Sequence, residues 1–228
     1  MTSLIAAALY FVLLHLLVSG TALRGALVGI IREGPYMALF SLASLAGIVW
    51  LSMAYGEARG TGETLWDLGA GARHGGLLIM LAAFLLAVPG LLTPNPTSVK
   101  QEGALEKPDP ARGILRVTRH PFLWGVAIWA GGHLLANGDT PSVVLFGSLA
   151  FLALSGTFSI DAKRRKALGA KYEAFTAQTS NLPFAAVLTG KQKLKLGEIG
   201  WWRLLLAAAI YAAVLRAHPL LFGVSPLG

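Results

Sequence analysis

Two histidines are the only ionisable residues near the middle of the long apolar segments of this sequence. His15 lies in the first of these segments and His133 in the fourth. An ionisable side chain at such a depth in a bilayer is costly and is usually functional. Helical rise places the two at comparable depth, so the pair could ligate one metal or haem iron. The alternative is that each imidazole hydrogen-bonds to a backbone or hydroxyl group of a neighbouring helix.

A second group of candidate residues begins the fourth apolar segment. Arg119 and His120 directly precede Pro121, which suits the first turn of a helix because its missing N–H is not needed there. A helix N-terminus that carries Arg and His is a good site for an anion, such as a carboxylate, a phosphate or a haem propionate. The alternative is a basic anchor at the membrane surface, with His120 capping the helix.

Composition indicates that helices in a membrane hold these residues. The chain is 55% hydrophobic and 13% charged, whereas a soluble domain has roughly 25% charged residues. A helix that crosses a bilayer needs about 20 mostly apolar residues. We therefore predict an all-α fold, a polytopic bundle that forms one integral membrane domain over residues 1–228. About six transmembrane helices are expected, at Ser3–Leu23, Pro35–Tyr55, Gly75–Leu92, Phe122–Ala136, Ser142–Ile160 and Trp201–Leu221.

The basic residues are distributed unevenly between the loops. The first, third and fifth loops, with the adjacent Arg203, hold sixteen of the nineteen Lys and Arg residues. The positive-inside rule places these loops in the cytoplasm, which gives an inner-membrane protein of the bacterial type with both termini periplasmic. The net charge of +8 then faces the lipid bilayer and not nucleic acid. Prolines predict an extended third loop, and Asp161–Ala177 reads as an amphipathic surface helix.

Several segments together resemble the NnrU family of membrane proteins and the related cis-zeta-carotene isomerases of plants and cyanobacteria. The resemblance covers nearly the whole chain. It rests on His15, Ser19-Gly20, Leu23-Arg24, Arg119-His120-Pro121, Leu123-Trp124-Gly125, His133, Asp161, Arg164-Arg165, Asn181 and Pro183-Phe184-Ala185-Ala186.

The resemblance implies a haem b protein. The isomerase uses its haem to isomerise one double bond of a polyene, a small hydrophobic substrate, and its two ligating histidines match His15 and His133. A cysteine that is proposed to ligate the oxidised iron in the isomerase has no counterpart, because this chain has no cysteine and Ala130 stands in that region. The NnrU family is also associated with denitrification and nitric oxide metabolism.

A second resemblance points to a different cofactor. Arg119-His120-Pro121 and Gly125 are similar to a motif of membrane methyltransferases that act on isoprenylcysteine or phospholipid. Those enzymes use a pair of acidic residues to contact S-adenosylmethionine, and only Asp161 stands at the corresponding place here. A methyltransferase is therefore the alternative to the haem protein, and a non-catalytic assembly protein for a respiratory enzyme is the third class.

The charge distribution gives a topology that can be tested directly. We expect reporter fusions after Ala136 and after Phe222 to read as periplasmic, and a fusion near Gln192 to read as cytoplasmic. Alkaline phosphatase and fluorescent-protein fusions measure the two sides independently. A cytoplasmic reading after Phe222 would show that the number of spans is odd.

Overall fold

The structure, a computed structural model, describes residues 1–227 and confirms the predicted all-α bundle. Every one of the six apolar segments forms a helix. The six helices are α1 (Thr2–Leu13), α3 (Glu33–Ala58), α4 (Gly69–Leu92), α5 (Pro121–Ala136), α6 (Thr140–Leu168) and α10 (Trp201–Phe222).

Four of these helices, α3, α4, α6 and α10, are long and apolar enough to cross a membrane. The first apolar segment reaches that length only together with α2 (Leu23–Ile31), and the two parts meet at an angle of 78°. Helix α5 has 16 residues and is shorter than a full span. The six helices are thus confirmed, and six complete crossings stay a prediction.

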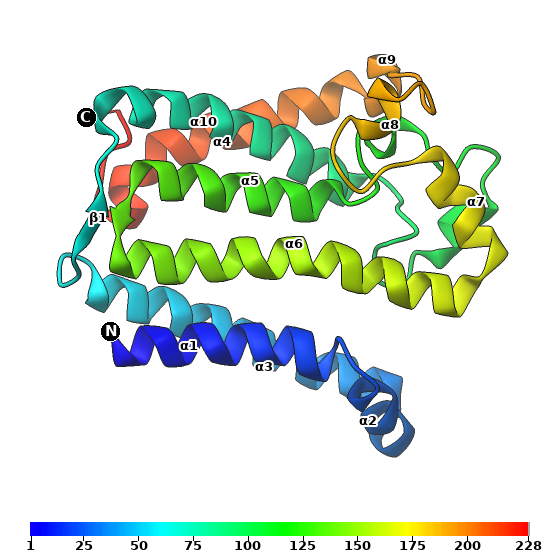
Figure 1. Ribbon diagram of the computed structural model, residues 1–228, viewed down its shortest axis with the longest axis horizontal. Helices are drawn as coiled ribbons and strands as arrows, with labels where there is room; N and C mark the ends of the chain where they lie inside the picture. The colour runs from blue at the N-terminus through cyan, green and yellow to red at the C-terminus, as the bar shows by residue number, and fades with distance from the viewer. Residues whose placement is uncertain (228) are drawn as a thin grey trace.

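The long helices lie side by side, with both chain termini at one end of the bundle (Figure 1). Helix α5 packs between α4 and α6, α10 packs on α4, and α1 and α3 cover α6 from the other side. At the end with the termini, β1 (Thr64–Trp66) pairs antiparallel with β2 (Gly138–Asp139). The Asp139 carboxylate then accepts a hydrogen bond from the backbone of Ser142 at 2.9 Å and caps α6. The basic loops all gather at the opposite end, as the charge distribution requires.

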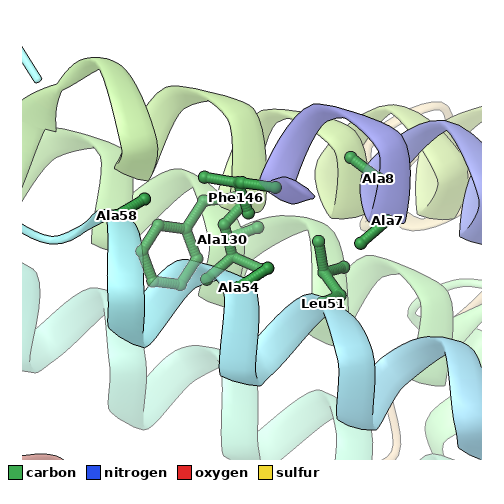
Figure 2. Packing of buried hydrophobic residues seen from close by; sticks show 9 residues of the cluster. Ala7, Ala8, Leu51, Ala54, Ala58, Ala130 and Phe146 are labelled. Carbon is green, nitrogen blue, oxygen red and sulfur yellow. The ribbon is translucent and has the colours of Figure 1, made fainter. Parts of the chain in front are cut away.

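Small side chains pack α1 and α3 against α5 and α6 (Figure 2). Alanines from α1, α3 and α5 allow the backbones of these helices to approach closely, and Phe146 of α6 fills the space between them. The labelled members of this cluster are Ala7, Ala8, Leu51, Ala54, Ala58, Ala130 and Phe146.

A π-helical turn, Leu14–Val18, interrupts the first apolar segment. The Ser19 amide donates to the Leu14 carbonyl five residues earlier, at 3.3 Å. Gly20 follows, and a Cβ atom there would lie 2.0 Å from the Leu16 carbonyl oxygen, so the bend requires glycine. The first span was predicted to continue to Leu23. It ends at Val18 instead, because the π turn and Gly20 redirect the chain into α2.

The third and fifth loops fold into a cap over the end of the bundle opposite the termini. The third loop was predicted to be extended, but it contains the 3-10 turns η2 (Glu102–Glu106) and η3 (Gly113–Arg116) and buries much of its length. The helix predicted over Asp161–Ala177 breaks at Gly169, whose φ is 52°. Its second part, α7 (Ala170–Gln178), buries Tyr172 and Phe175 against the third loop and α4, so its apolar face packs on protein. The short helices α8 (Ala185–Leu188) and α9 (Leu196–Ile199) complete the cap.

The close packing of α4 against α5 depends on Gly125. A Cβ atom at this position would lie 2.7 Å from the Cβ of Ala87 and 2.9 Å from the Ala83 carbonyl oxygen. We expect Gly125→Ala to lower the free energy of unfolding by about 1–3 kcal/mol through overpacking. Gly131→Ala in the same helix meets nothing within 4 Å and is the matched control, with a gain of about 0.4–1 kcal/mol. Thermal unfolding in detergent measures both, and equal stability of the two variants would contradict the packing.

Candidate functional site

The Asp161 carboxylate lies at the centre of a buried polar cluster near the capped end of the bundle. Arg119 donates to it through Nε at 2.9 Å and also through Nη2. His120 Nε2 lies 2.8 Å and the Tyr172 hydroxyl 2.7 Å from the same carboxylate oxygen, Oδ1. All four side chains are buried, Tyr172 completely. A buried carboxylate is tolerated only when it is paired and hydrogen-bonded in this way.

Four segments that are distant in the sequence build this cluster. Asp161 comes from the end of α6, Tyr172 from α7, and His120 is the residue before the first turn of α5. The third loop supports the cluster from behind, because the amide of Asn95 and the hydroxyl of Thr97 donate to the Arg119 carbonyl at 3.0 and 3.1 Å.

The fifth loop closes the cluster from the other side. The backbone of Arg119 donates to the Ser180 carbonyl at 3.0 Å, and Thr118 donates its hydroxyl to the Asn181 carbonyl at 2.5 Å. The Asn181 side chain in turn accepts from the Trp124 indole at 3.1 Å and donates to Thr157 at 2.9 Å. The cluster therefore fixes the two loops to α5 and α6.

The hydrogen bonds determine how the ring of His120 is oriented. Burial lowers the pKa of His120 in spite of the neighbouring carboxylate, which favours the neutral ring. Nε2 then carries the proton that it shares with Asp161, and Nδ1 carries a lone pair. This Nδ1 is buried and has no hydrogen-bond partner within residues 1–227. Burial and the bond to Asp161 also raise the pKa of Tyr172, so its hydroxyl stays protonated as a donor.

The sequence predicts that Arg119 and His120 bind an anion, and in the structure that anion belongs to the protein itself. The Asp161 carboxylate accepts hydrogen bonds from Nε and Nη2 of Arg119. The remaining nitrogen, Nη1, donates to the Thr179 carbonyl at 3.4 Å. A propionate or another external carboxylate would have to displace Asp161 from this position.

His15 lies within the π turn, where its ring is enclosed by aromatic side chains. Its Nδ1 donates to the Phe11 carbonyl at 2.7 Å, so Nε2 carries the lone pair and accepts from the Ser44 hydroxyl at 3.2 Å. The ring centroid is 4.4 Å from that of Phe11 and 5.3 Å from that of Phe40. π turns occur frequently at functional sites, and this one presents the lone pair of His15 toward α3.

His133 has a similar local arrangement at a different place. Its Nδ1 donates to the Trp129 carbonyl at 2.9 Å, which again leaves the lone pair on Nε2. The ring stacks on Phe146 of α6, with 4.5 Å between centroids and an interplanar angle of 19°. A carbonyl that holds Nδ1–H is the arrangement that orients an imidazole for metal ligation through Nε2.

The structure does not bring the two imidazoles together. His15 contacts Ser44 of α3, whereas His133 stacks on Phe146, whose ring lies 5.9 Å from that of Tyr55 of α3. Ser44 and Tyr55 are eleven residues apart, so the two imidazoles differ in level by roughly 16 Å at 1.5 Å per residue. Ligand nitrogens on opposite sides of one iron would be roughly 4 Å apart, given metal–imidazole distances near 2 Å. The expected common depth fails because the straight part of the first helix ends at Val18.

A haem therefore fits these residues only in part. Either imidazole has the hydrogen bonding of a metal ligand, and the pair is not arranged to hold one iron from both sides. Within residues 1–227, no group of three or more His, Asp or Glu side chains is placed to hold a metal ion.

The protein is a helical membrane bundle whose basic loops form a folded cap around the buried cluster. A family model described as NnrU protein matches residues 3–226, and the chain belongs to that family. Both the family resemblance and its extent over the chain are thus confirmed.

The chain is also similar to two plant isomerases. The chain is 30% identical over 169 residues to a chloroplastic 15-cis-zeta-carotene isomerase of Zea mays, a match that covers 72% of this chain and 45% of the relative. It is 30% identical over 205 residues to the isomerase of the same name from Arabidopsis thaliana, covering 86% and 54%. The chain thus spans about half the length of these relatives. No solved structure matches it significantly.

The buried cluster predicts a large cost when its central charge is removed. We expect Asp161→Asn to lower the free energy of unfolding by about 3–5 kcal/mol, because Arg119 would stay buried without its partner. Glu173→Gln is the matched control, since Glu173 pairs with Arg165 at an exposed site where such pairs contribute at most about 1 kcal/mol. Thermal unfolding in detergent measures both variants. Equal stability would show that Arg119 finds another acceptor.

Proposed function

We propose that the protein is a cis–trans isomerase that acts on an apolar polyene of the carotenoid type. The observation that carries the proposal is the similarity to two 15-cis-zeta-carotene isomerases, which extends over as much as 86% of this chain. The family match over residues 3–226 includes both the first helix, with His15, and the buried cluster around Asp161. The proposed setting is the inner membrane of a bacterial cell.

The chemistry of the bundle agrees with this kind of reaction. An isomerisation exchanges no atoms with the substrate, so it needs neither a nucleophile nor a chain of proton carriers across the membrane. The first helix with its π turn and α5 contain no Asp, Glu, Lys or Arg, and their only histidines are His15 and His133, each in the last turn of its helix. Apolar side chains line the long helices. A polyene is an apolar substrate whose burial in such surroundings is favoured by the hydrophobic effect.

We further propose that haem b is the cofactor, held through Nε2 of His15 or of His133. A bound haem would supply a reversible one-electron exchange that lowers the order of a double bond. The protein residues orient the ligand: the Phe11 carbonyl holds Nδ1–H of His15, and the Trp129 carbonyl holds that of His133. Simultaneous ligation by both would require the first helix to shift along the bundle when haem binds.

The alternatives differ in what the purified protein binds. A methyltransferase would bind S-adenosylmethionine and contain no haem, although the one carboxylate at the corresponding place, Asp161, is already bonded to Arg119, His120 and Tyr172. An assembly protein would bind neither and would copurify with an oxidoreductase. A haem protein of nitric oxide metabolism would show a haem spectrum that changes on addition of nitric oxide, without isomerase activity.

The purified protein should convert 15-cis-zeta-carotene in detergent to an isomer with a different retention time, measured by chromatography. If His15 alone holds the iron, His15→Ala should abolish the conversion and the haem absorption, because the lone pair on Nε2 is lost. His74→Ala is the control, since His74 is exposed and its Nδ1 bonds only the Ala70 carbonyl. Wild-type protein that binds haem but leaves the polyene unchanged would refute the isomerase.

His133→Ala then separates the two kinds of ligation. If both imidazoles bind one iron, this variant changes a six-coordinate low-spin spectrum to a five-coordinate one. If one imidazole alone holds the iron, the spectrum of His133→Ala is unchanged when His15 is the ligand, and the haem is lost when His133 is the ligand. Retention of the wild-type spectrum in both variants would place the ligand elsewhere and refute haem binding by either histidine.

A further inference from the structure

A pocket opens at the capped end of the bundle, between the end of α4, the third loop and the start of α10. It consists of two adjoining cavities of about 440 and 320 Å³. Both are lined by Thr93, Pro94, Ala104 and Lys107. The pocket shares no lining residue with the Asp161 cluster and does not include His15 or His133.

Four cationic side chains line the pocket. Lys100 and Lys107 line the larger cavity, and Lys107, Arg112 and Arg203 line the smaller one. None of these four cations forms an ion pair within residues 1–227. The cations in the lining are therefore free of carboxylate partners in the part of the chain that the structure describes.

The two carboxylates that also line the smaller cavity are already engaged. Asp109 accepts from Arg116 at 2.6 Å, and Glu198 accepts from Arg116 at 2.7 Å and lies 3.3 Å from Lys195. The hydrogen bond from Arg116 lowers the pKa of Glu198 to about 2, so this carboxylate is charged and paired at neutral pH. The acids therefore neutralise Arg116 and Lys195, which lie beside the pocket, and leave its own cations uncompensated.

Two hydrogen-bonding groups in the lining have no partner. Thr93 is 6% exposed, and its buried Oγ1 makes no hydrogen bond within residues 1–227. The Nε of Arg203 is also buried and unpaired, while its Nη1 donates to the Ile199 carbonyl at 2.9 Å. Nε can only donate and the hydroxyl can donate, so the partner that suits both is an acceptor. Buried donors without an acceptor are rare, and beside four cations the suitable acceptor is an anion.

The position of the pocket indicates that the anion is part of an amphiphile. Trp201 and Trp202 begin α10 with 64% and 57% exposure, as in the aromatic belt of a membrane interface. Leu91 and Leu92 form an apolar wall of the larger cavity, and Leu91 is 62% exposed. A ligand here can place an anionic group against the cations and an acyl chain along these leucines.

We propose that this pocket binds the phosphate group of an anionic phospholipid. Arg203 and Thr93 donate hydrogen bonds to the phosphate oxygens, and Lys107 and Arg112 supply further charge. Basic pockets between helices on the cytoplasmic side of a membrane recognise lipid headgroups in this manner. Binding would fix the third loop to the start of α10 and so stabilise the cap.

Native mass spectrometry of the full-length protein, with added phosphatidylglycerol or phosphatidylcholine in nonionic detergent, tests the proposal. We expect phosphatidylglycerol to be retained preferentially, and Lys107→Gln/Arg203→Gln to lower its retention about tenfold, which corresponds to roughly 1.4 kcal/mol. Lys191→Gln/Lys193→Gln is the matched control, because it removes two cations that lie outside the pocket.

Thr93→Val tests the pocket without a change of charge. Because the hydroxyl has no partner in the lipid-free protein, the variant should fold with unchanged or slightly higher thermal stability and still retain less phosphatidylglycerol. If Lys191→Gln/Lys193→Gln lowers phosphatidylglycerol retention as much as Lys107→Gln/Arg203→Gln does, the proposal is overturned. The lipid would then be attracted by the general surface charge and not by the pocket.

Inorganic phosphate distinguishes a lipid from a soluble phosphate. If phosphate raises the melting temperature of wild-type protein but not of the pocket pair, while neither lipid is retained, the lipid source is overturned and a soluble phosphate compound is the ligand. If the binding of phosphate and the binding of phosphatidylglycerol are both unaffected by the pocket substitutions, only water satisfies Thr93 and Arg203. The proposal then fails. These measurements do not involve polyene or haem, so their failure is distinct from failure of the isomerase.

Discussion

The buried Asp161 carboxylate is the constraint on which the capped end of the bundle depends. A charge at 3% exposure cannot rely on water, so donors from the protein must surround it. Those donors come from the start of α5 and from α7. Arg119 and His120 precede Asp161 by 42 and 41 residues, and Tyr172 follows it in α7. Satisfying one carboxylate therefore sets the register of α5 against α6 and requires both long loops to fold back over the helix ends. Such a network contributes mainly to the specificity of the arrangement.

The rest of the bundle is organised by close packing of small residues. Alanines and Gly125 bring α1, α3, α4 and α5 near one another, and Phe146 fills the space that remains. The two imidazoles are held apart, because His133 is stacked on Phe146 in the last turn of α5 and His15 is placed by the π turn three residues before the straight part of the first helix ends. Joining them on one iron would require the helices that carry them to move, whereas ligation by one imidazole requires no approach of the two histidines.

The sequence predicts the helices well, since apolar composition and the unequal distribution of Lys and Arg act over whole segments. It predicts less about the site. Arg119 and His120 are recognisable from Pro121 and the helix start, but their partner Asp161 follows about 40 residues later, and no local pattern joins them. One signal was available: Asp161 is the single acidic residue at the end of the fifth apolar segment, in a chain with an excess of cations. The π turn at Leu14–Val18 has no such signal, because its residues are as apolar as those of an ordinary helix.

The cap contains two groups of cations. One is paired with a carboxylate of the protein, and the other has no carboxylate partner within residues 1–227. At the inner group, Arg119 is surrounded by protein and its carboxylate comes from α6, so the charge is satisfied when the chain folds. At the outer group, the carboxylates of Asp109 and Glu198 are bound to Arg116, and Lys107, Arg112 and Arg203 face a pocket beside the aromatic belt. Arg116 thus pairs with the two acids that line the pocket, and the pocket-lining cations have no carboxylate partner among the residues that the structure describes. If a lipid phosphate supplies the missing acceptor, the inner carboxylate would order the cap during folding, and the membrane would complete its outer side.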